Sequence, residues 1–235
     1  MTPRSARRSS DGVTFSLVAR CTRTGQFGMV IASSSPAVAA RCAHVRAGVG
    51  VVASQNVTDP ALGPLILDRL QAGLSATAAL AAVTDGLAHA GYRQLLVVDR
   101  QGLAATHSGT QVLGTWGVAE GRGSAAGGNL LADAGVPAAM VAAFEAAAGH
   151  LADRLMAALT AGLAAGGEAG PVQSAGLKVA DRLCWPVVDL RVDWSDAPIG
   201  DLAALWTRYR PQMQAYVDRA EDPSRAPSYG VPGDP

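Results

Sequence analysis

Alternation of apolar and polar positions first appears at residues 14–20 (TFSLVAR), which predicts a half-buried β-strand. Residues 22–25 (TRTG) have turn composition, and residues 26–33 (QFGMVIAS) form a second apolar run. Two such runs joined by a short turn predict an antiparallel hairpin. A third apolar run follows at residues 47–54 (AGVGVVAS), whose two glycines indicate close backbone packing.

Helical spacing of apolar residues alternates with these strand patterns along the rest of the chain. Asp59-Pro60 and Ser75 are typical helix starts, and Gly73 and Gly166-Gly167 are typical stops. The predicted helices cover residues 60–72, 75–87, 137–148, 150–165 and 199–219.

A second set of strands lies between and after these helices. The predicted strands cover residues 94–99, 103–108, 174–180 and 187–192, and no strand is predicted in the glycine-rich stretch 116–131. Tight turns between neighbouring strands favour antiparallel sheets, and paired helices are suited to cover the outer faces of two stacked sheets. The element order therefore predicts an α+β fold in layers, without the strict βαβ alternation of a doubly wound sheet.

Composition indicates the domain organisation and argues against nucleic acid as a partner. With 235 residues, of which 49% are hydrophobic, the chain can bury one core. We expect a disordered leader or mis-assigned start over 1–13, one domain over 14–221, and a Pro/Gly-rich tail over 222–235 that wraps the surface. The 19 basic and 19 acidic residues balance, so no charge field favours nucleic acid.

The cysteines and the apolar runs indicate the compartment. Three cysteines without CxxC spacing fit a reducing cytoplasm, and they indicate neither a disulfide framework nor a zinc site. No apolar run reaches the ~20 residues that span a bilayer, and Arg7-Arg8 lacks the apolar segment of an export signal. We therefore expect a cytoplasmic protein without a membrane partner.

Thr14 is the residue with the most informative position, because it begins the first predicted strand. A threonine hydroxyl can attack an amide carbonyl when its own α-amine, with a pKa of about 7.7–8, serves as general base. The alternative is that Thr14 is one more β-favouring residue at a strand start. Thr2 is a poorer candidate, because no rigid element holds it in position.

Several polar residues are predicted to surround Thr14. Arg46 precedes the third apolar run, where it is expected to lie beside the N-terminus and lower the pKa of the amine. The residues that we expect to bind a polar substrate or to complete an oxyanion hole are Ser33, Ser34, Gln55 and Asn56. Each has a plainer explanation: a surface arginine in one case, and turn or helix-start chemistry in the others.

Two further candidates come from the second half of the predicted fold. Asn129 follows Gly127-Gly128, where backbone and side-chain amides are able to converge on an oxyanion, or where asparagine merely tolerates a left-handed loop. Arg93 precedes a buried strand and is expected either to bind a carboxylate or to face solvent. The four histidines show no HxH or HxxxH spacing, so no metal site is predicted.

Six segments of the chain together resemble a known bacterial family. They are residues 14–20 (TFSLVAR), 31–38 (IASSSPAV), 46–55 (RAGVGVVASQ), 92–99 (YRQLLVVD), 127–132 (GGNLLA) and 187–192 (VVDLRV). The chain is similar in these segments to the domain of unknown function 1028. That family is placed in the N-terminal-nucleophile (Ntn) hydrolase superfamily.

The resemblance implies a four-layer αββα sandwich and, by analogy with the superfamily, cleavage of an amide bond. The superfamily nucleophile is the first residue of the first strand, which corresponds to Thr14. In the proteasome-like branch a lysine begins the third strand, whereas this chain has Arg46, which cannot accept a proton.

The resemblance also raises the question of how Thr14 obtains a free amine. Members of the family begin Met-Thr-Phe, and Val13 stands here at the methionine position. We expect translation to begin at Val13 through a GTG codon. Self-cleavage before Thr14, or a blocked and inactive Thr14, are the alternatives.

The sequence therefore predicts an amidohydrolase for a small polar substrate that needs no cofactor and no metal. Its catalytic residues are Thr14, Arg46 and Asn129, and its substrate-binding residues are Ser33, Ser34, Gln55, Asn56 and Arg93. A non-catalytic binding or assembly protein, and a hydrolase that uses Ser34 as nucleophile, are the rival hypotheses. Formation of a homo-oligomer is left open.

Overall fold

The computed structural model describes residues 13–232 as a mixed α+β fold with two antiparallel sheets. Residues 1–12 of the predicted leader and the last three residues of the predicted tail lie outside this range. Within the described range no helix combines the length and the apolar character needed to cross a membrane.

The larger sheet has six strands, and its two central strands are the first two in the sequence. The order is β10 (Val188–Val192), β9 (Ser174–Ala180), β2 (Phe27–Ser33), β1 (Thr14–Arg20), β8 (Ser124–Asn129) and β7 (Gly117–Gly121). The hairpin predicted for residues 14–33 is present, with Thr14 opposite Ser33 and Arg20 opposite Phe27. Strand β1 therefore has a hydrogen-bonded neighbour on each side.

The smaller sheet has four strands in the order β3 (Ala43–Arg46), β4 (Gly50–Asn56), β5 (Arg93–Asp99) and β6 (Ala104–Ser108). The β5–β6 hairpin was predicted, whereas β3 was not. The alanine-rich segment before β3 forms a short helix, α1 (Val38–Cys42), which is followed directly by β3.

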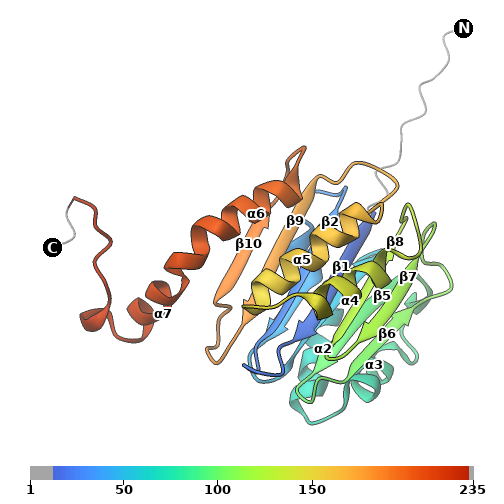
Figure 1. Cartoon of the computed structure of the whole chain (residues 1–235). Helices are drawn as coiled ribbons and strands as arrows, with labels where there is room; N and C mark the ends of the chain where they lie inside the picture. Colours follow the sequence, from blue (N-terminus) through green and yellow to red (C-terminus); the bar gives the residue numbers. More distant parts are fainter. Residues whose placement is uncertain (1–12, 233–235) are drawn as a thin grey trace, which may run out of the picture.

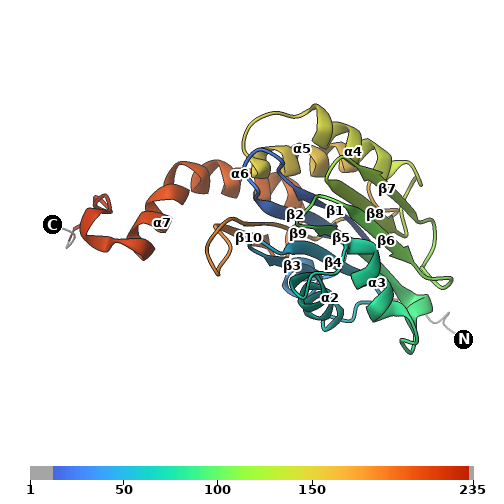
Figure 2. The ribbon, with the colours of Figure 1, turned by 90° about the horizontal axis from the view of Figure 1, so that it is seen from below.

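The two sheets stack face to face, and helices cover both outer faces (Figures 1 and 2). Helices α4 (Val136–Ala146) and α5 (Leu151–Ala164) pack on the six-stranded sheet, and α2 (Leu62–Gln71) and α3 (Ala76–Thr84) pack on the four-stranded sheet. Three separate buried clusters fill the spaces between these four layers.

The faces of β1 show how the sequence pattern produces this layering. Phe15, Leu17 and Ala19 contribute to the cluster under α4 and α5, and Val18 contributes to the cluster between the sheets. Because side chains alternate along a strand, Thr14 and Ser16 face the second sheet together with Val18. The alternation at residues 14–20 thus marks a strand that is buried on both faces.

Strands β7 and β8 lie in the glycine-rich stretch 116–131, for which the sequence pattern indicated no particular element. Strand β8 pairs with β1, and its four central residues are alanine and glycine. At Gly128 a β-carbon would lie 2.6 Å from Leu131 and 3.0 Å from the backbone oxygen of Thr14. Small residues here permit close packing beside β1, which is why strand propensity missed the element.

The C-terminal region differs from its prediction in two respects. The single helix predicted over 199–219 is divided into α6 (Pro198–Tyr209), the 3₁₀ turn η2 (Arg210–Gln212) and α7 (Met213–Glu221), because Pro211 lacks an N–H donor. The described part of the tail does not wrap the sheets. Helix α7 and the tail project from the sandwich, and Arg219 there donates a 2.7 Å bond to the oxygen of Pro227 (Figure 1).

Candidate functional site

Thr14 lies at one end of β1, between two strands that present polar residues at the same level. In the pairing of the strands, Thr14 lies opposite Ser33 on β2 and opposite Asn129 on β8. Thr14 is 4% exposed, and its side chain faces the second sheet. It therefore lies at one end of the space between the two sheets.

The hydroxyl of Thr14 belongs to a short chain of hydrogen bonds. It donates to the hydroxyl of Ser33 over 3.2 Å, and Ser33 donates to the backbone oxygen of Val13. The hydroxyls of Ser33 and Ser35 are hydrogen-bonded over 2.8 Å, and the Ser35 hydroxyl accepts a 2.6 Å hydrogen bond from the guanidinium of Arg41. Ser33 therefore contacts both the threonine hydroxyl and the carbonyl of the peptide bond that precedes Thr14.

A group that we call the amide cluster, made of Ser16, Gln55, Gln94 and Asn129, joins the two sheets beneath Thr14. Ser16 donates to Gln55 over 2.6 Å, and the amides of Gln55 and Asn129 both donate to the side-chain oxygen of Gln94, over 2.8 and 3.3 Å. All four residues have zero exposed surface. Such buried networks hold their members in one arrangement when their bonds are satisfied.

Asn129 is the member of the amide cluster with spare hydrogen-bonding capacity. Its side-chain nitrogen carries two N–H donors, of which one is used toward Gln94. Its side-chain oxygen is buried and has no hydrogen-bond partner. The left-handed loop considered for Asn129 is wrong, since the residue ends strand β8 opposite Thr14.

The other predicted binding residues hold the surrounding backbone. Gln55 is closed off within the amide cluster, so contact with a substrate would require it to break its present bonds. Asn56 donates to the oxygen of Tyr92 and accepts from the N–H of Leu113, and Arg93 donates to the oxygen of Val57. Ser34 accepts a 3.2 Å bond from the N–H of Val13.

The expected position of Arg46 beside Thr14 is wrong. Arg46 pairs with Gly50, at the end of β4 opposite to Gln55 and Asn56. Its guanidinium forms a 2.8 Å ion pair with Asp68 and a 2.6 Å bond to Gln71, both on α2. Because β3 ends at Arg46 before the chain turns into β4, the residue lies at the far end of the smaller sheet.

Glu168 is a polar residue near this site that the pattern analysis missed. It is 5% exposed, and one carboxyl oxygen accepts a 3.1 Å bond from the N–H of Ser34. The other oxygen is buried without a partner. Burial raises the pKa of Glu168 to about 8, although the Ser34 bond opposes the shift. An isolated acidic residue between Gly166-Gly167 and Gly170-Pro171 was the available signal.

Within residues 13–232 no group of three or more histidine, cysteine, aspartate or glutamate side chains is arranged to hold a metal ion. The three cysteines are free, with Cys21 and Cys42 buried and Cys184 exposed.

Comparison with known proteins identifies the relatives of this chain. The chain resembles the crystal structure of protein SPO2555 from Silicibacter pomeroyi, itself described as a DUF1028 family protein, with 32% identity and a TM-score of 0.79. The similarity covers 84% of this chain and 86% of that one. No curated protein matches the chain. The model of the family of unknown function DUF1028 matches residues 14–202, beginning at Thr14, and the chain therefore belongs to this family.

Proposed function

We propose that the chain is an amidohydrolase of the N-terminal-nucleophile type, which cleaves the C–N bond of a small polar substrate. Thr14 is the nucleophile, and the fold is the αββα sandwich of that superfamily. The observation that carries the proposal is the position of Thr14 at the start of the central strand β1, bonded to Ser33 and opposite Asn129.

The reaction follows from the groups around Thr14. The free α-amine takes the hydroxyl proton while the oxygen attacks the amide carbon, and the same proton then passes to the departing amine. The acyl group remains on the threonine oxygen as an ester, which water hydrolyses to regenerate Thr14. The unused amide N–H of Asn129 stabilises the negative carbonyl oxygen in both steps, which requires the end of the inter-sheet space to open, because Asn129 has no exposed surface.

The proposal requires a free amine at Thr14. Arg46 has no part in it, because its ion pair with Asp68 keeps it at the other end of the smaller sheet. Ser33 instead orients the threonine hydroxyl, and no cofactor enters the chemistry. Ser34, the alternative nucleophile, accepts from the N–H of Val13.

Three measurements on protein expressed from its native gene test the proposal. Intact mass and N-terminal sequencing show whether the mature chain begins at Thr14. A β-lactone or chloromethyl ketone probe, followed by peptide mapping, then shows whether this residue is reactive. We expect a free Thr14 that carries the label, and no label in Thr14→Ala.

The alternative outcomes separate the rival functions. A species that retains residues 1–12 in full lacks the required amine and contradicts the proposal. A free but unlabelled Thr14 favours a non-catalytic binding protein, a reading supported by the 4% exposure of Thr14. Labelling of Ser34 with full reactivity in Thr14→Ala would assign the nucleophile to Ser34.

A further inference from the structure

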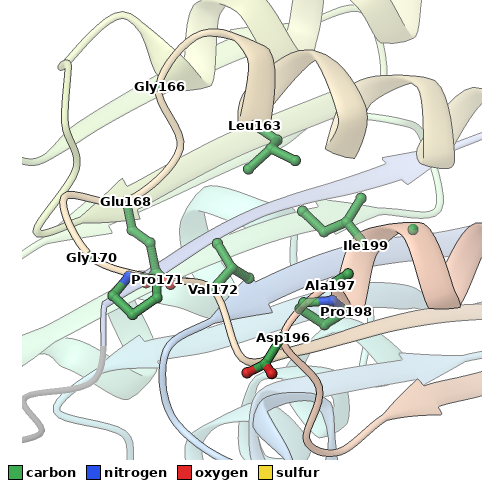
Figure 3. A pocket seen from close by; sticks show the side chains of 11 residues that line it. Leu163, Gly166, Glu168, Gly170, Pro171, Val172, Asp196, Ala197, Pro198 and Ile199 are labelled. Atoms are coloured by element: carbon green, nitrogen blue, oxygen red, sulfur yellow. The ribbon is translucent and has the colours of Figure 1, made fainter.

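A cavity of about 430 Å³ lies on the helix-covered side of the six-stranded sheet, between the end of α5 and the start of α6. Figure 3 shows aliphatic side chains around it from both helices and from the loop that joins α5 to β9. Its apolar lining comes from Leu163, Pro171, Val172, Pro198 and Ile199. The surface of this cavity is therefore suited to an aliphatic group.

Glu168 is the buried polar group of this cavity. In Figure 3 its side chain extends toward Pro171. One carboxyl oxygen is used by the N–H of Ser34, and the other has no partner although it is buried. A buried polar atom without a hydrogen bond costs free energy, and a ligand that bonds to it recovers this cost. The cavity thus provides one strong polar contact within an apolar lining.

The charged residues around the cavity indicate whether its ligand is a cation or an anion. Asp196 also lines it, and the lining contains no lysine, arginine or histidine. The N-terminus of α6 would favour an anion, but Pro198 removes one of its N–H donors and Asp201 adds a negative charge to its first turn. Asp201 is bonded to Ser195, and Asp133, near the loop, is bonded to Gly135. The local charge is therefore negative.

We propose that this cavity binds a small aliphatic ammonium ion, whose charged nitrogen pairs with Glu168 and whose hydrocarbon body fills the apolar lining. The cavity lies on the face of the six-stranded sheet opposite to the side chain of Thr14, and Ser34 connects the two regions through its bonds with Glu168 and Val13. This inference does not depend on the hydrolase function.

Ionisation of Glu168 gives the proposal a distinctive pH dependence. Because burial raises the pKa of Glu168 to about 8, the empty site holds a proton at neutral pH. An ammonium ligand binds the ionised carboxylate, so binding releases this proton. We expect the affinity to rise about tenfold from pH 6 to 7 and to level off above about pH 8. A neutral or anionic ligand that accepts from the protonated carboxyl would instead lose affinity above that pH.

Titration calorimetry with three probes of matched shape tests the proposal. Cyclohexylmethylamine is cationic at these pH values, cyclohexylmethanol is neutral and cyclohexanecarboxylate is anionic. We expect the amine to bind, with proton uptake by the buffer at pH 7, and the other two to bind at least about tenfold more weakly. Tighter binding of the alcohol or the carboxylate, or no binding of the amine up to about 10 mM, overturns the proposal.

Two variants connect the binding to the cavity. Glu168→Gln keeps the shape of the side chain and should lose the amine affinity by about tenfold or more, together with its pH dependence. Glu145→Gln removes an exposed carboxylate on α4 and serves as the matched control. Leu163→Trp, at a lining position that is 45% exposed, should weaken binding by occupying the cavity even if Glu168→Gln folds poorly. Unchanged amine affinity in both cavity variants contradicts the assignment.

Discussion

Two buried polar sites lie at the same end of the six-stranded sheet, on its opposite faces. Between the sheets, the amide cluster gives its members hydrogen-bond partners within the protein, apart from the side-chain oxygen of Asn129. On the outer face, Glu168 has one bond from the protein and one oxygen without a partner. The first site is a largely completed network, whereas the second lacks a group that a ligand can supply.

Two consecutive serines at the end of strand β2 contribute to both environments: Ser33 is its last residue and Ser34 follows it. Ser33 contacts Thr14 on the inter-sheet side, and the N–H of the next residue, Ser34, contacts Glu168. Ser33 acts through its side chain and Ser34 through its backbone N–H, so these neighbouring residues serve two separate sites. The two sites, although close in sequence, are therefore expected to respond to different substitutions.

The largest expected effect concerns the hydroxyl of Thr14. Thr14→Ala in a chain with a confirmed free N-terminus should lower probe labelling or amide turnover by at least about 10³-fold, because the attacking oxygen is gone. Thr14→Ser keeps this oxygen and should retain much of the reactivity. Glu145→Gln, at an exposed position on α4, is the control. Equal losses in Thr14→Ala and Glu168→Gln would show that the two sites are not independent.

The second prediction concerns stability and pH at Glu168. A folded-state pKa of about 8, raised from 4.5, means that the folded protein holds a proton that the unfolded chain releases between these values. The contribution of Glu168 to the free energy of unfolding is therefore fully present below about pH 4.5 and is lost as the pH rises toward 8. Between pH 5 and 8 the free energy of unfolding should fall by at most about 4 kcal/mol.

Glu168→Gln should remove this pH dependence, since the amide does not titrate. Urea denaturation of the wild type and of Glu168→Gln at several pH values measures the difference. Glu145→Gln, at an exposed position, should follow the wild-type curve. Parallel curves for the wild type and Glu168→Gln would show that Glu168 is ionised in the folded protein.

The third prediction concerns the network on the inner face. Gln94→Ala removes the acceptor shared by Gln55 and Asn129 and should destabilise the protein by about 1–3 kcal/mol, because buried donors lose their partner. Gln71→Ala removes an exposed glutamine on α2 and should change stability by less than about 0.5 kcal/mol. Denaturant midpoints measure both. A Gln94→Ala midpoint equal to that of Gln71→Ala would mean that the amide cluster contributes no net stability.

The smallest expected effect is that of Arg46. Arg46→Ala breaks an ion pair with Asp68 at a partly exposed position and should cost no more than about 1 kcal/mol. The rate of Thr14 labelling should stay unchanged, because Arg46 lies at the far end of the smaller sheet. A labelling rate that falls about tenfold or more without loss of stability would reinstate the interaction predicted from the sequence.

The pattern of the sequence predicted the elements whose burial follows a regular period. The β1–β2 hairpin, the β5–β6 hairpin and Ser75 as the cap of α3 were all expected, and Ser75 accepts a bond from the N–H of Ala78. Strand β8 was missed because its alanines and glycines reflect close packing against β1, which no local pattern records. Strand β3 was missed because it has only four residues and follows directly on a helix.

The sequence by itself therefore determined the α+β class, most strands and helices, and the position of Thr14 at the start of a buried strand. Only the tertiary structure decided which polar residues share a site: it brought Ser33, Asn129 and the amide cluster to Thr14, moved Arg46 away, and enclosed Glu168. The physical reason is that periodicity specifies which face of an element is buried. Contacts between distant segments depend on strand order and register, and burial of a single carboxyl depends on all the elements packed around it.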